Sequence, residues 1–351
     1  MVASLPPSPL LYPEVMQRLP KVDLHRHLEG SLRLRTMLEI ARQYGLTVPV
    51  STAQLRPLVE VTQEEGHNFR NFLSKFQTLR LFYRTPEIIS RVTHEAIADA
   101  AADGLVYLEL LFTPIALARA QGFAMRDVMD WVVASAGKAA REFDITVRLI
   151  AAINRHESVD IAEEITQLSV DRMSAGVCGL DLAGNEAEFP ASPFLGLFKQ
   201  AKTSGLHISV HAGEWGGAEN VRFAIEQFGA DRIGHGIHIL EDPSVTALAC
   251  ERGIPFTVCL TSNLQTGAVP SLASHPLPRM LQAGLNASIN TDDPSISQIN
   301  LSGEYRLAMQ ALGISQSVLL ERILAAAEAA FLPAADRQPI IARLKARIAQ
   351  V

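Results

Sequence analysis

Eight short runs of β-branched and other apolar residues recur along the chain, and each is followed by a segment long enough for an amphipathic helix. We expect strands at residues 22–25, 105–110, 146–151, 177–181, 207–211, 232–235, 254–259 and 286–290. From the second run onward, successive runs start 22 to 41 residues apart, which suits one strand and one crossover helix. Eight such units predict an α/β fold, a (β/α)8 TIM barrel.

We expect residues 1–351 to form a single domain, in which residues 1–19 are an N-terminal extension. No internal repeat, linker or low-complexity tract divides the chain. A doubly wound open sheet is the alternative fold. In such a sheet, polar clusters would gather near one switch point, whereas here they follow strands all along the chain.

The first interval, residues 26–104, is too long for one crossover helix. Extra helices are expected at residues 34–44, from about residue 53, and at residues 68–82. The last of them carries apolar residues at helical spacings, namely Phe69, Phe72, Leu73 and Phe76. An insertion after the first strand of a barrel lies over the mouth, so part of this stripe is expected to form a lid. Two helices, at residues 315–330 and 339–349, are expected to close the barrel.

The charge and composition of the chain limit the kinds of partner that it is expected to bind. The formal net charge is −6 and no Lys/Arg run occurs, which argues against a nucleic-acid or anionic-membrane partner. No stretch of about 18 apolar residues is free of charges or breakers, so no membrane span is expected. Cys178, Cys250 and Cys259 are too few and too scattered for a disulfide framework or a Cys-rich zinc module. A cytoplasmic, reducing location is expected.

The first chemical cluster ends the first strand and reads Val22-Asp-Leu-His-Arg-His-Leu-Glu-Gly30. His25 and His27 are two residues apart, so both imidazoles project from one face of the strand. Two imidazoles held in this way suit Zn²⁺. Arg26 alternates with them and is expected to face away in a structural role. A His-x-His pair is a weak signal by itself, because single histidines are more often core or surface residues.

More titratable side chains follow later strands. His211 ends one strand and is followed by Glu214, and His235 ends the next between two glycines. Asp292 and Asp293 come directly after the eighth strand, where a turn or a helix cap is the alternative reading. The carboxyl ends of barrel strands share one rim, so these side chains are expected to meet there.

Three histidines and one carboxylate would leave a divalent ion one open position, as in catalytic zinc sites. Such an ion lowers the pKa of bound water toward about 7. A further histidine can take the proton of that water, and a carboxyl with a raised pKa can protonate the electrophile. Hydrolytic displacement at a carbon that bears nitrogen or oxygen is the reaction class that this set predicts.

Nearly the whole chain, from about residue 20 to residue 332, resembles the adenosine deaminases, which are (β/α)8 members of the metal-dependent amidohydrolases. Six stretches carry the resemblance: 21–30, Leu180-Asp-Leu-Ala-Gly-Asn-Glu186, Val210-His-Ala-Gly-Glu214, Arg232-Ile-Gly-His-Gly236, Cys259-Leu-Thr-Ser-Asn263 and Asn290-Thr-Asp-Asp-Pro294. Six stretches in this order are highly specific, and they look closest to the bacterial branch of the family. The resemblance implies zinc-dependent conversion of adenosine or 2′-deoxyadenosine to the inosine product and ammonia.

The resemblance also implies roles for individual residues. One zinc per chain would be bound by four ligands: His25, His27, His211 and Asp292. Glu214 would give a proton to purine N1, and His235 would orient and deprotonate the attacking water. Asp293 would hydrogen-bond N7, and Gly184 would hydrogen-bond N3 through its backbone. The segment from Phe72 to Phe76 resembles the apolar gate over the ribose pocket.

One position departs from the family pattern. Many adenosine deaminases carry Asp where this chain has Glu29, so the contact to the ribose 5′-hydroxyl is changed. Related branches act on adenine, on N6-modified adenylate or on 6-amino-6-deoxyfutalosine. The stretch from Asp181 to Gly184 looks like the nucleoside type rather than the adenine type. No dense Lys/Arg cluster stands near the motifs, although Arg26, Arg33 and Arg80 could supply isolated charges. The aminodeoxyfutalosine reading remains an alternative.

Other classes fit the sequence less well. Binuclear amidohydrolases use a lysine after strand four, whereas here no lysine follows until Lys199. The full signature of cytidine-type deaminases, His-x-Glu together with Pro-Cys-x-x-Cys, is absent because no Pro-Cys-x-x-Cys occurs. An inactive purine-binding barrel is expected to lack one of the metal ligands or the proton donor. All of these residues are present in this chain. Structural roles are preferred for the remaining candidates, which are His156, His207, His238 and His275, and Asp181 is expected to support the rim. The oligomeric state is left open.

Overall fold

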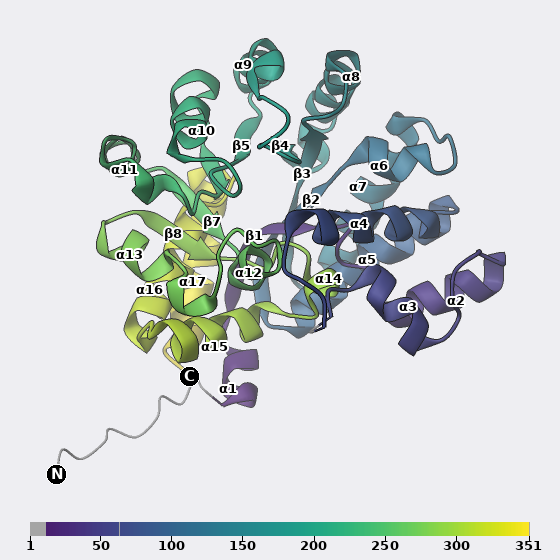
Figure 1. Ribbon diagram of the computed structural model, residues 1–351, viewed down its shortest axis with the longest axis horizontal. Helices are drawn as coiled ribbons and strands as arrows, with labels where there is room; N and C mark the ends of the chain where they lie inside the picture. Colours follow the sequence, from purple (N-terminus) through teal and green to yellow (C-terminus); the bar gives the residue numbers. More distant parts are fainter. Residues whose placement is uncertain (1–11, 63, 351) are drawn as a thin grey trace.

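The computed structural model describes residues 12–62 and 64–350, and eight parallel strands form its centre (Figure 1). The predicted extension, residues 1–19, lies outside the described residues over its first 11 positions. The strands pair in chain order from first to last. They are β1 Lys21–His27, β2 Leu105–Phe112, β3 Thr146–Asn154, β4 Val177–Ala183, β5 His207–Ala212, β6 Arg232–His235, β7 Pro255–Val258 and β8 Asn286–Ile289.

The ring closes between the first and last strands at one point. Arg26 and Asp292 form a parallel bridge. The Asp292 amide donates to the His25 carbonyl (2.8 Å), and the His27 amide donates to the Asp292 carbonyl (2.8 Å). An open doubly wound sheet would leave its outermost strands unpaired. These contacts therefore exclude the open sheet and confirm the predicted (β/α)8 TIM barrel. The closure also places a carboxylate from beyond β8 beside the two histidines of β1.

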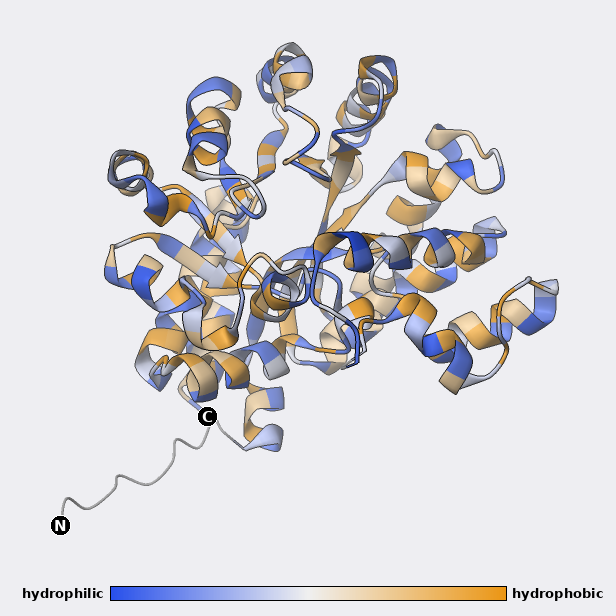
Figure 2. Ribbon diagram, in the orientation of Figure 1, coloured by the Kyte–Doolittle hydropathy of each residue, from blue (hydrophilic) through white to orange (hydrophobic). Residues whose placement is uncertain are grey.

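Helices surround the barrel and carry apolar residues beside hydrophilic ones, as amphipathic packing on a sheet requires (Figure 2). The helices before β4 are α1 Pro13–Arg18, α2 Leu34–Tyr44, α3 Thr52–Val59, α4 Phe69–Leu79, α5 Pro86–Ala102, α6 Pro114–Arg119, α7 Met125–Glu142 and α8 Val159–Val170. Those after it are α9 Leu195–Thr203, α10 Ala218–Phe223, α11 Pro243–Glu251, α12 Leu260–Gln265, α13 Leu277–Gln282, α14 Pro294–Ser297, α15 Leu301–Leu312, α16 Gln316–Glu328 and α17 Ala334–Ile348. Within the described part of the chain, none of them is both long and apolar enough to cross a bilayer.

The helical insertion after strand one is confirmed, and α2 to α5 occupy it. The Asn68 side chain caps α4 by accepting a hydrogen bond from the Asn71 amide (2.9 Å). A short 3₁₀ turn, Arg80–Phe82, follows α4 and completes the expected 68–82 segment. Buried Lys75 ties α4 to the segment before it, because its ammonium lies 2.7 Å from Glu65 Oε2 and donates to the Pro57 carbonyl (2.7 Å).

One boundary at the C-terminus differs from the expectation. The helix predicted at 339–349 begins five residues earlier, at Ala334, and runs through Pro339. Proline is favoured in the first turn of a helix, so the residue type alone is compatible with a helix that starts at Pro339. Here it stands within the helix and removes one backbone hydrogen bond, while Ile340, Ile341 and Leu344 are buried in the core.

The lower end of the barrel, where β5 and β6 begin, is filled by a buried polar cluster. Glu109 of β2 forms an ion pair with Arg232 and accepts hydrogen bonds from the Tyr107 hydroxyl (2.8 Å) and the Phe331 amide (2.6 Å). The Arg232 guanidinium lies 3.7 Å from the centre of the Phe331 ring, on which His207 also stacks. His207 therefore sits at the end of the barrel opposite the predicted site, as expected.

Candidate active site

A cavity of about 330 Å³ opens at the carboxyl ends of the strands. Ten of the eleven site residues predicted from the sequence line it: His27, Glu29, Phe72, Phe76, Gly184, His211, Glu214, His235, Asp292 and Asp293. The eleventh, His25, is buried, and its Nε2 lies 3.3 Å from His27 Nε2. Residues up to 268 positions apart in the sequence are thus brought to one rim.

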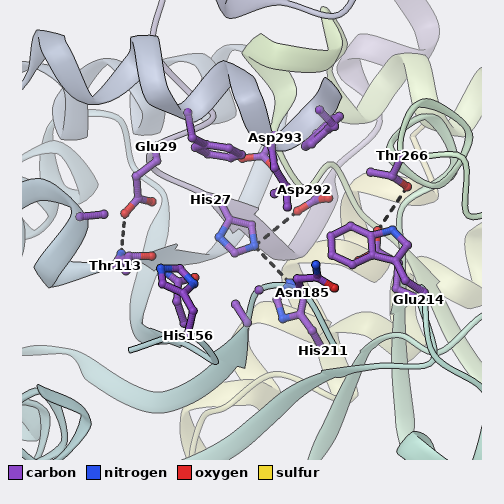
Figure 3. A pocket seen from close by; sticks show the side chains of 18 of the residues that line it. His27, Glu29, Thr113, His156, Asn185, His211, Glu214, Thr266, Asp292 and Asp293 are labelled. Carbon is purple, nitrogen blue, oxygen red and sulfur yellow. Dashed lines mark hydrogen bonds and ion pairs between the residues drawn. The ribbon is translucent and has the colours of Figure 1, made fainter. Parts of the chain in front are cut away.

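The nitrogen and oxygen atoms at the centre of this rim are spaced like the ligands of one metal ion. His27 Nε2 lies 3.3 Å from His25 Nε2 and 3.4 Å from His211 Nε2. Asp292 Oδ1 lies 3.4 Å from Nε2 of both His25 and His27 (Figure 3). Around one zinc with bonds of about 2.0–2.1 Å, neighbouring donor atoms are about 2.9–3.4 Å apart, and the ion can take a water as a fifth ligand. The four residues therefore fit a single zinc ion.

Three of these four side chains have a polar partner on the side that faces away from the cluster. Asp181 Oδ2 lies 2.7 Å from His211 Nδ1, and Thr257 Oγ1 lies 2.9 Å from His25 Nδ1. Ser262 donates to Asp292 Oδ2 (2.6 Å). Such partners set the orientation and tautomer of metal ligands and leave Nε2 or the other carboxylate oxygen free for the ion. Asp181 was expected to support the rim, and it does so through His211.

The charge states of His27 and Asp292 suit a cation. Burial lowers the pKa of His27 to about 3, so its imidazole is neutral and has a free lone pair at ordinary pH. Burial opposes the ionisation of Asp292, but its hydrogen bond to His25 and the neighbouring histidines hold its pKa well below the usual value. A neutral imidazole and an ionised carboxylate are the forms in which these side chains bind Zn²⁺.

His235 stands next to the ligand set. His25, His211, His235 and Asp292 offer ligand atoms that all lie within 4.8 Å of one another. The amide of Asn263 lies 3.0 Å from His235 Nδ1, so Nε2 is the nitrogen that faces Glu214, at 3.6 Å. Burial lowers the pKa of His235 well below its usual value, which keeps the ring neutral.

Two of these residues have a strained backbone. His235 and Asp292 have φ angles of 59° and 63°, in the left-handed region that residues other than glycine seldom adopt. Such strain is tolerated where the surrounding structure imposes it, and it concentrates at functional sites. At Asp292 the two backbone hydrogen bonds to β1 impose it, and they turn the carboxylate toward the histidines.

Glu214 is buried beside the ligand set. Within the described residues, its carboxyl has one hydrogen-bond partner, the Thr266 hydroxyl at 3.5 Å. Burial, with the negative charges of Asp292 and Glu186, raises the pKa of Glu214 well above its usual value. This shift favours the protonated carboxyl, the form that can donate a proton or a hydrogen bond into the cavity.

The loop that carries Glu214 is held by a carboxylate whose role the sequence did not reveal. Glu186 Oε1 accepts from the amides of Glu214 (2.6 Å), Trp215 (2.7 Å) and Gly216 (2.9 Å). Its Oε2 accepts from the Gly213 amide (3.0 Å) and from the Asn220 side chain (2.9 Å). Five donors on one buried carboxylate make the loop after β5 rigid. Glu186 stood in a quoted motif, but the motif alone does not indicate which backbone it binds.

Asp293 lies against a glycine that leaves space for it. A Cβ atom on Gly30 would stand 1.8 Å from Asp293 Oδ1, so only glycine is tolerated there. That oxygen is buried and has no hydrogen-bond partner in the described residues. Burial and the nearby charges of Asp292, Glu29 and Glu214 raise the pKa of Asp293 well above its usual value. Its carboxyl, like that of Glu214, can donate to a ligand. Gly184, with φ of 93°, presents backbone to the same cavity.

Glu29 lies on the opposite side of the cavity from Glu214, as Figure 3 shows. Its Oε1 accepts from the Thr113 amide (2.6 Å), and its buried Oε2 has no partner within the part of the chain described. Phe72 and Phe76, which were predicted to form a lid, also line the cavity. Next to them, Phe69 of α4 packs against Trp215 of the β5 loop, with ring centres 5.2 Å apart.

The remaining candidate residues fall into two groups, those that make structural contacts and those that lie at or near the cavity. Arg26 bonds Asp23 (3.1 Å), which confirms its structural role, and His238 pairs with exposed Glu241 (2.6 Å). Structural roles were preferred for His156 and His275 as well. His156 instead lines the cavity. His275 Nε2 lies 3.4 Å from the side-chain oxygen of Asn263, and the Asn263 side chain also contacts His235. Strand positions alone did not place these two residues.

Comparisons with known proteins agree with this geometry. The sequence profile of the family described as adenosine deaminase matches residues 20–347. An adenosine deaminase of Klebsiella pneumoniae (strain 342) is 38% identical over 328 residues, which are 93% of this chain and 98% of that protein. The solved adenine deaminase from Arthrobacter aurescens has a TM-score of 0.86 at 28% identity, covering 94% of this chain and 99% of that chain.

A zinc-bound amidohydrolase from Burkholderia ambifaria is a further solved neighbour, with a TM-score of 0.86 at 26% identity over 100% of this chain and 98% of that chain. The family profile covers nearly the whole chain, and the Klebsiella relative matches it from end to end. The His/Asp cluster fits the metal dependence of these hydrolases. The chain therefore belongs to the adenosine deaminase family, whose members are hydrolases that act on C–N bonds of small purines.

Proposed function

We propose that the protein hydrolyses the 6-amino group of adenosine and 2′-deoxyadenosine, releasing ammonia and the inosine product, with one zinc ion per chain. The observation that carries this proposal is the set of donor atoms of His25, His27, His211 and Asp292, 3.3–3.4 Å apart, beside the buried carboxyl of Glu214. We assign the four residues as the zinc ligands. When bound, zinc lowers the pKa of water and so supplies a nucleophile at neutral pH.

Two side chains are proposed to move protons. The Glu214 carboxyl gives a proton to purine N1, which draws electron density from C6 and makes that carbon a better electrophile. Its raised pKa supports this role, because an ionised carboxylate has no proton to give. Neutral His235, 3.6 Å from Glu214, accepts the proton of the water that adds to C6. The proton then passes to the amino group, so that the C–N bond breaks and ammonia leaves.

Substrate recognition is assigned to the remaining lining groups. Protonated Asp293 donates to purine N7, and the Gly184 backbone contacts N3. The carboxyl of Asp293 has an oxygen without a protein partner, which a ring nitrogen would satisfy. A site built from such groups discriminates against analogues that leave them unpaired. Phe72 and Phe76 are proposed to cover the bound nucleoside as a lid.

Glu29 favours a nucleoside over free adenine. Its Oε2 is buried without a partner at the end of the cavity farthest from Glu214, where a ribose hydroxyl would reach it. The second candidate substrate is adenine, because the similar solved structure from Arthrobacter aurescens is that of an adenine deaminase. Adenine would leave that carboxylate oxygen unsatisfied, and an unpaired buried polar group costs about 1–3 kcal/mol.

The proposed activity is tested by incubating the zinc-loaded protein with adenosine, 2′-deoxyadenosine, adenine and N6-methyladenylate. Ammonia release and the change in purine absorbance are measured, and the compounds are ranked by kcat/KM. The two nucleosides should be turned over best. If no 6-aminopurine releases ammonia from protein with full metal content, the proposal fails.

The surroundings of the enzyme are also proposed. We assign it to the cytoplasm, since Cys178, Cys250 and Cys259 are free thiols, as a reducing compartment favours. A small purine is the partner for which the cavity is suited. Nucleic acid and anionic membranes are disfavoured by the net charge of −6.

A further inference from the structure

A second cavity, of about 200 Å³, adjoins the first. The two share Arg80, from the turn after α4, and Ala116, from α6. The second cavity is otherwise lined by residues of these two segments and by Glu157 from the loop after β3. None of the roles assigned above to the purine or the zinc uses it.

Three arginines face this second cavity, namely Arg80, Arg84 and Arg119. Only Arg119 is neutralised, because it makes two hydrogen bonds to Glu157 (3.0 and 2.7 Å). In the described residues, the guanidinium groups of Arg80 and Arg84 have no ion pair or hydrogen bond, and the buried Nε of Arg80 is unsatisfied. The sequence shows no dense basic cluster, since these residues are spread over 40 positions. Folding makes one.

Unpaired guanidinium groups that line a cavity are suited to an anion. Each presents several N–H donors, and the planar fork matches phosphate or carboxylate oxygens. An unsatisfied buried donor such as Arg80 Nε is costly unless a ligand accepts its hydrogen bond. The net charge of the whole chain is −6, so this positive patch is a local feature and not the result of a generally basic surface.

The position of the second cavity fixes which part of a ligand would reach it. Glu214 and Thr266 lie on one side of the first cavity and Glu29 and Thr113 on the other (Figure 3). A nucleoside with its base at Glu214 directs the far end of its ribose toward Glu29. Arg80 lies close enough to influence the pKa of Glu29. The junction of the two cavities is therefore at the 5′ end of the sugar.

We propose that the cavity around Arg80 and Arg84 is an anion subsite, so that the enzyme also accepts 6-aminopurine nucleosides with a phosphate or carboxylate at the 5′ position. This inference rests on the proposed deaminase function and extends its substrate class. The anion would accept hydrogen bonds from Arg80 and Arg84. Arg119 and Glu157 would form the outer wall of the subsite.

The test compares adenosine, adenosine 5′-monophosphate and 5′-deoxy-5′-(carboxymethylthio)adenosine on the zinc-loaded enzyme. The variants are Arg84→Gln and, as a matched control, Arg35→Gln, whose side chain is 91% exposed on α2. For the anionic substrate, the ratio of its kcat/KM to that of adenosine should fall about tenfold in Arg84→Gln and stay constant in Arg35→Gln. The anion that shows the larger fall identifies phosphate or carboxylate as the natural group. If neither ratio falls further than in the control, the subsite does not exist.

A binding measurement keeps this test separate from the proposed activity. Calorimetry gives Kd for inosine and for inosine 5′-monophosphate, whether or not any substrate is turned over. The preference for the monophosphate should shrink with added salt and be lost in Arg84→Gln. Equal and salt-independent Kd values for the two compounds would overturn the subsite for phosphate and leave adenosine deamination unaffected. Absence of all turnover would instead overturn the deaminase proposal.

Discussion

Asp181 Oδ2 lies 2.7 Å from His211 Nδ1, and both side chains are buried. This contact links the end of β4 to the metal cluster. Burial alone would lower the pKa of His211, but the negative charge of Asp181 outweighs this effect and raises that pKa. Asp181 also orients the ring so that Nε2 faces the other ligands. Asp181 is thus a positioning residue for a ligand and not a ligand itself.

Removing the charge of Asp181 should weaken metal binding. In Asp181→Asn the amide can still accept a hydrogen bond from His211 Nδ1, but it no longer makes the imidazole more basic. Zinc affinity should fall about 10–100-fold, as at other carboxylate–histidine–zinc contacts. The measurement is a competition titration with a zinc chelator. The matched control is exposed Asp171→Asn, and equal affinities in the two variants would contradict the account.

Glu186→Gln should lower turnover without removing zinc. The carboxylate accepts five hydrogen bonds from the loop that carries Glu214, and one oxygen of an amide cannot replace both carboxylate oxygens. Displacement of the proton donor by about 1 Å can lower the rate about a hundredfold. Metal content and kcat are measured on the same preparation. Exposed Glu188→Gln, two residues away, should behave as wild type, and wild-type kcat in Glu186→Gln would refute the positioning role.

Glu214→Gln should keep the fold and the zinc but lose most activity. Glutamine fills the same space, yet it cannot give a proton to N1, so kcat should fall about 10²–10⁴-fold. Ammonia release and zinc content are the readouts, with exposed Glu219→Gln as the control. Comparable kcat values for the two variants would remove Glu214 from the mechanism.

Glu304 on α15 should make the protein less stable as pH rises. Burial raises the pKa of Glu304 to about 7, although hydrogen bonds from Thr261 oppose the shift. A carboxyl with a raised folded-state pKa binds its proton more tightly in the folded state than in the unfolded state. Stability is therefore lost as pH rises from about 4.5 through about 7.

The measurement is urea unfolding of wild type and Glu304→Gln at several pH values across that window. The variant has no titrating group at this position, so its stability relative to wild type should increase as pH rises. Exposed Glu328→Gln is the control and should show no such trend. A parallel pH dependence in wild type and Glu304→Gln would show that Glu304 is ionised in the folded protein throughout.

Periodicity was sufficient to predict the barrel and the rim. Strand ends carry His25, His27, His211 and His235 because alternation within a strand and the parallel arrangement of strands are both local patterns. The contacts of Glu186 were not predictable in this way, since its partners are backbone amides of a loop whose conformation the residue types do not specify. The same holds for Arg80, Arg84 and Arg119, which meet only when the α4 insertion packs beside α6. The predicted start of α17 at Pro339 was wrong. A proline is locally compatible with a helix start, but Ile340, Ile341 and Leu344 are buried in the core and hold a helix that runs through Pro339.

The central claim is that one zinc ion, held by His25, His27, His211 and Asp292, makes this chain an adenosine deaminase. Its most direct test is a titration of zinc into metal-free protein while ammonia release from adenosine is followed. Activity should rise linearly and reach its plateau at one zinc per chain. A plateau at two zinc ions per chain, or no ammonia at any zinc concentration, would contradict the account.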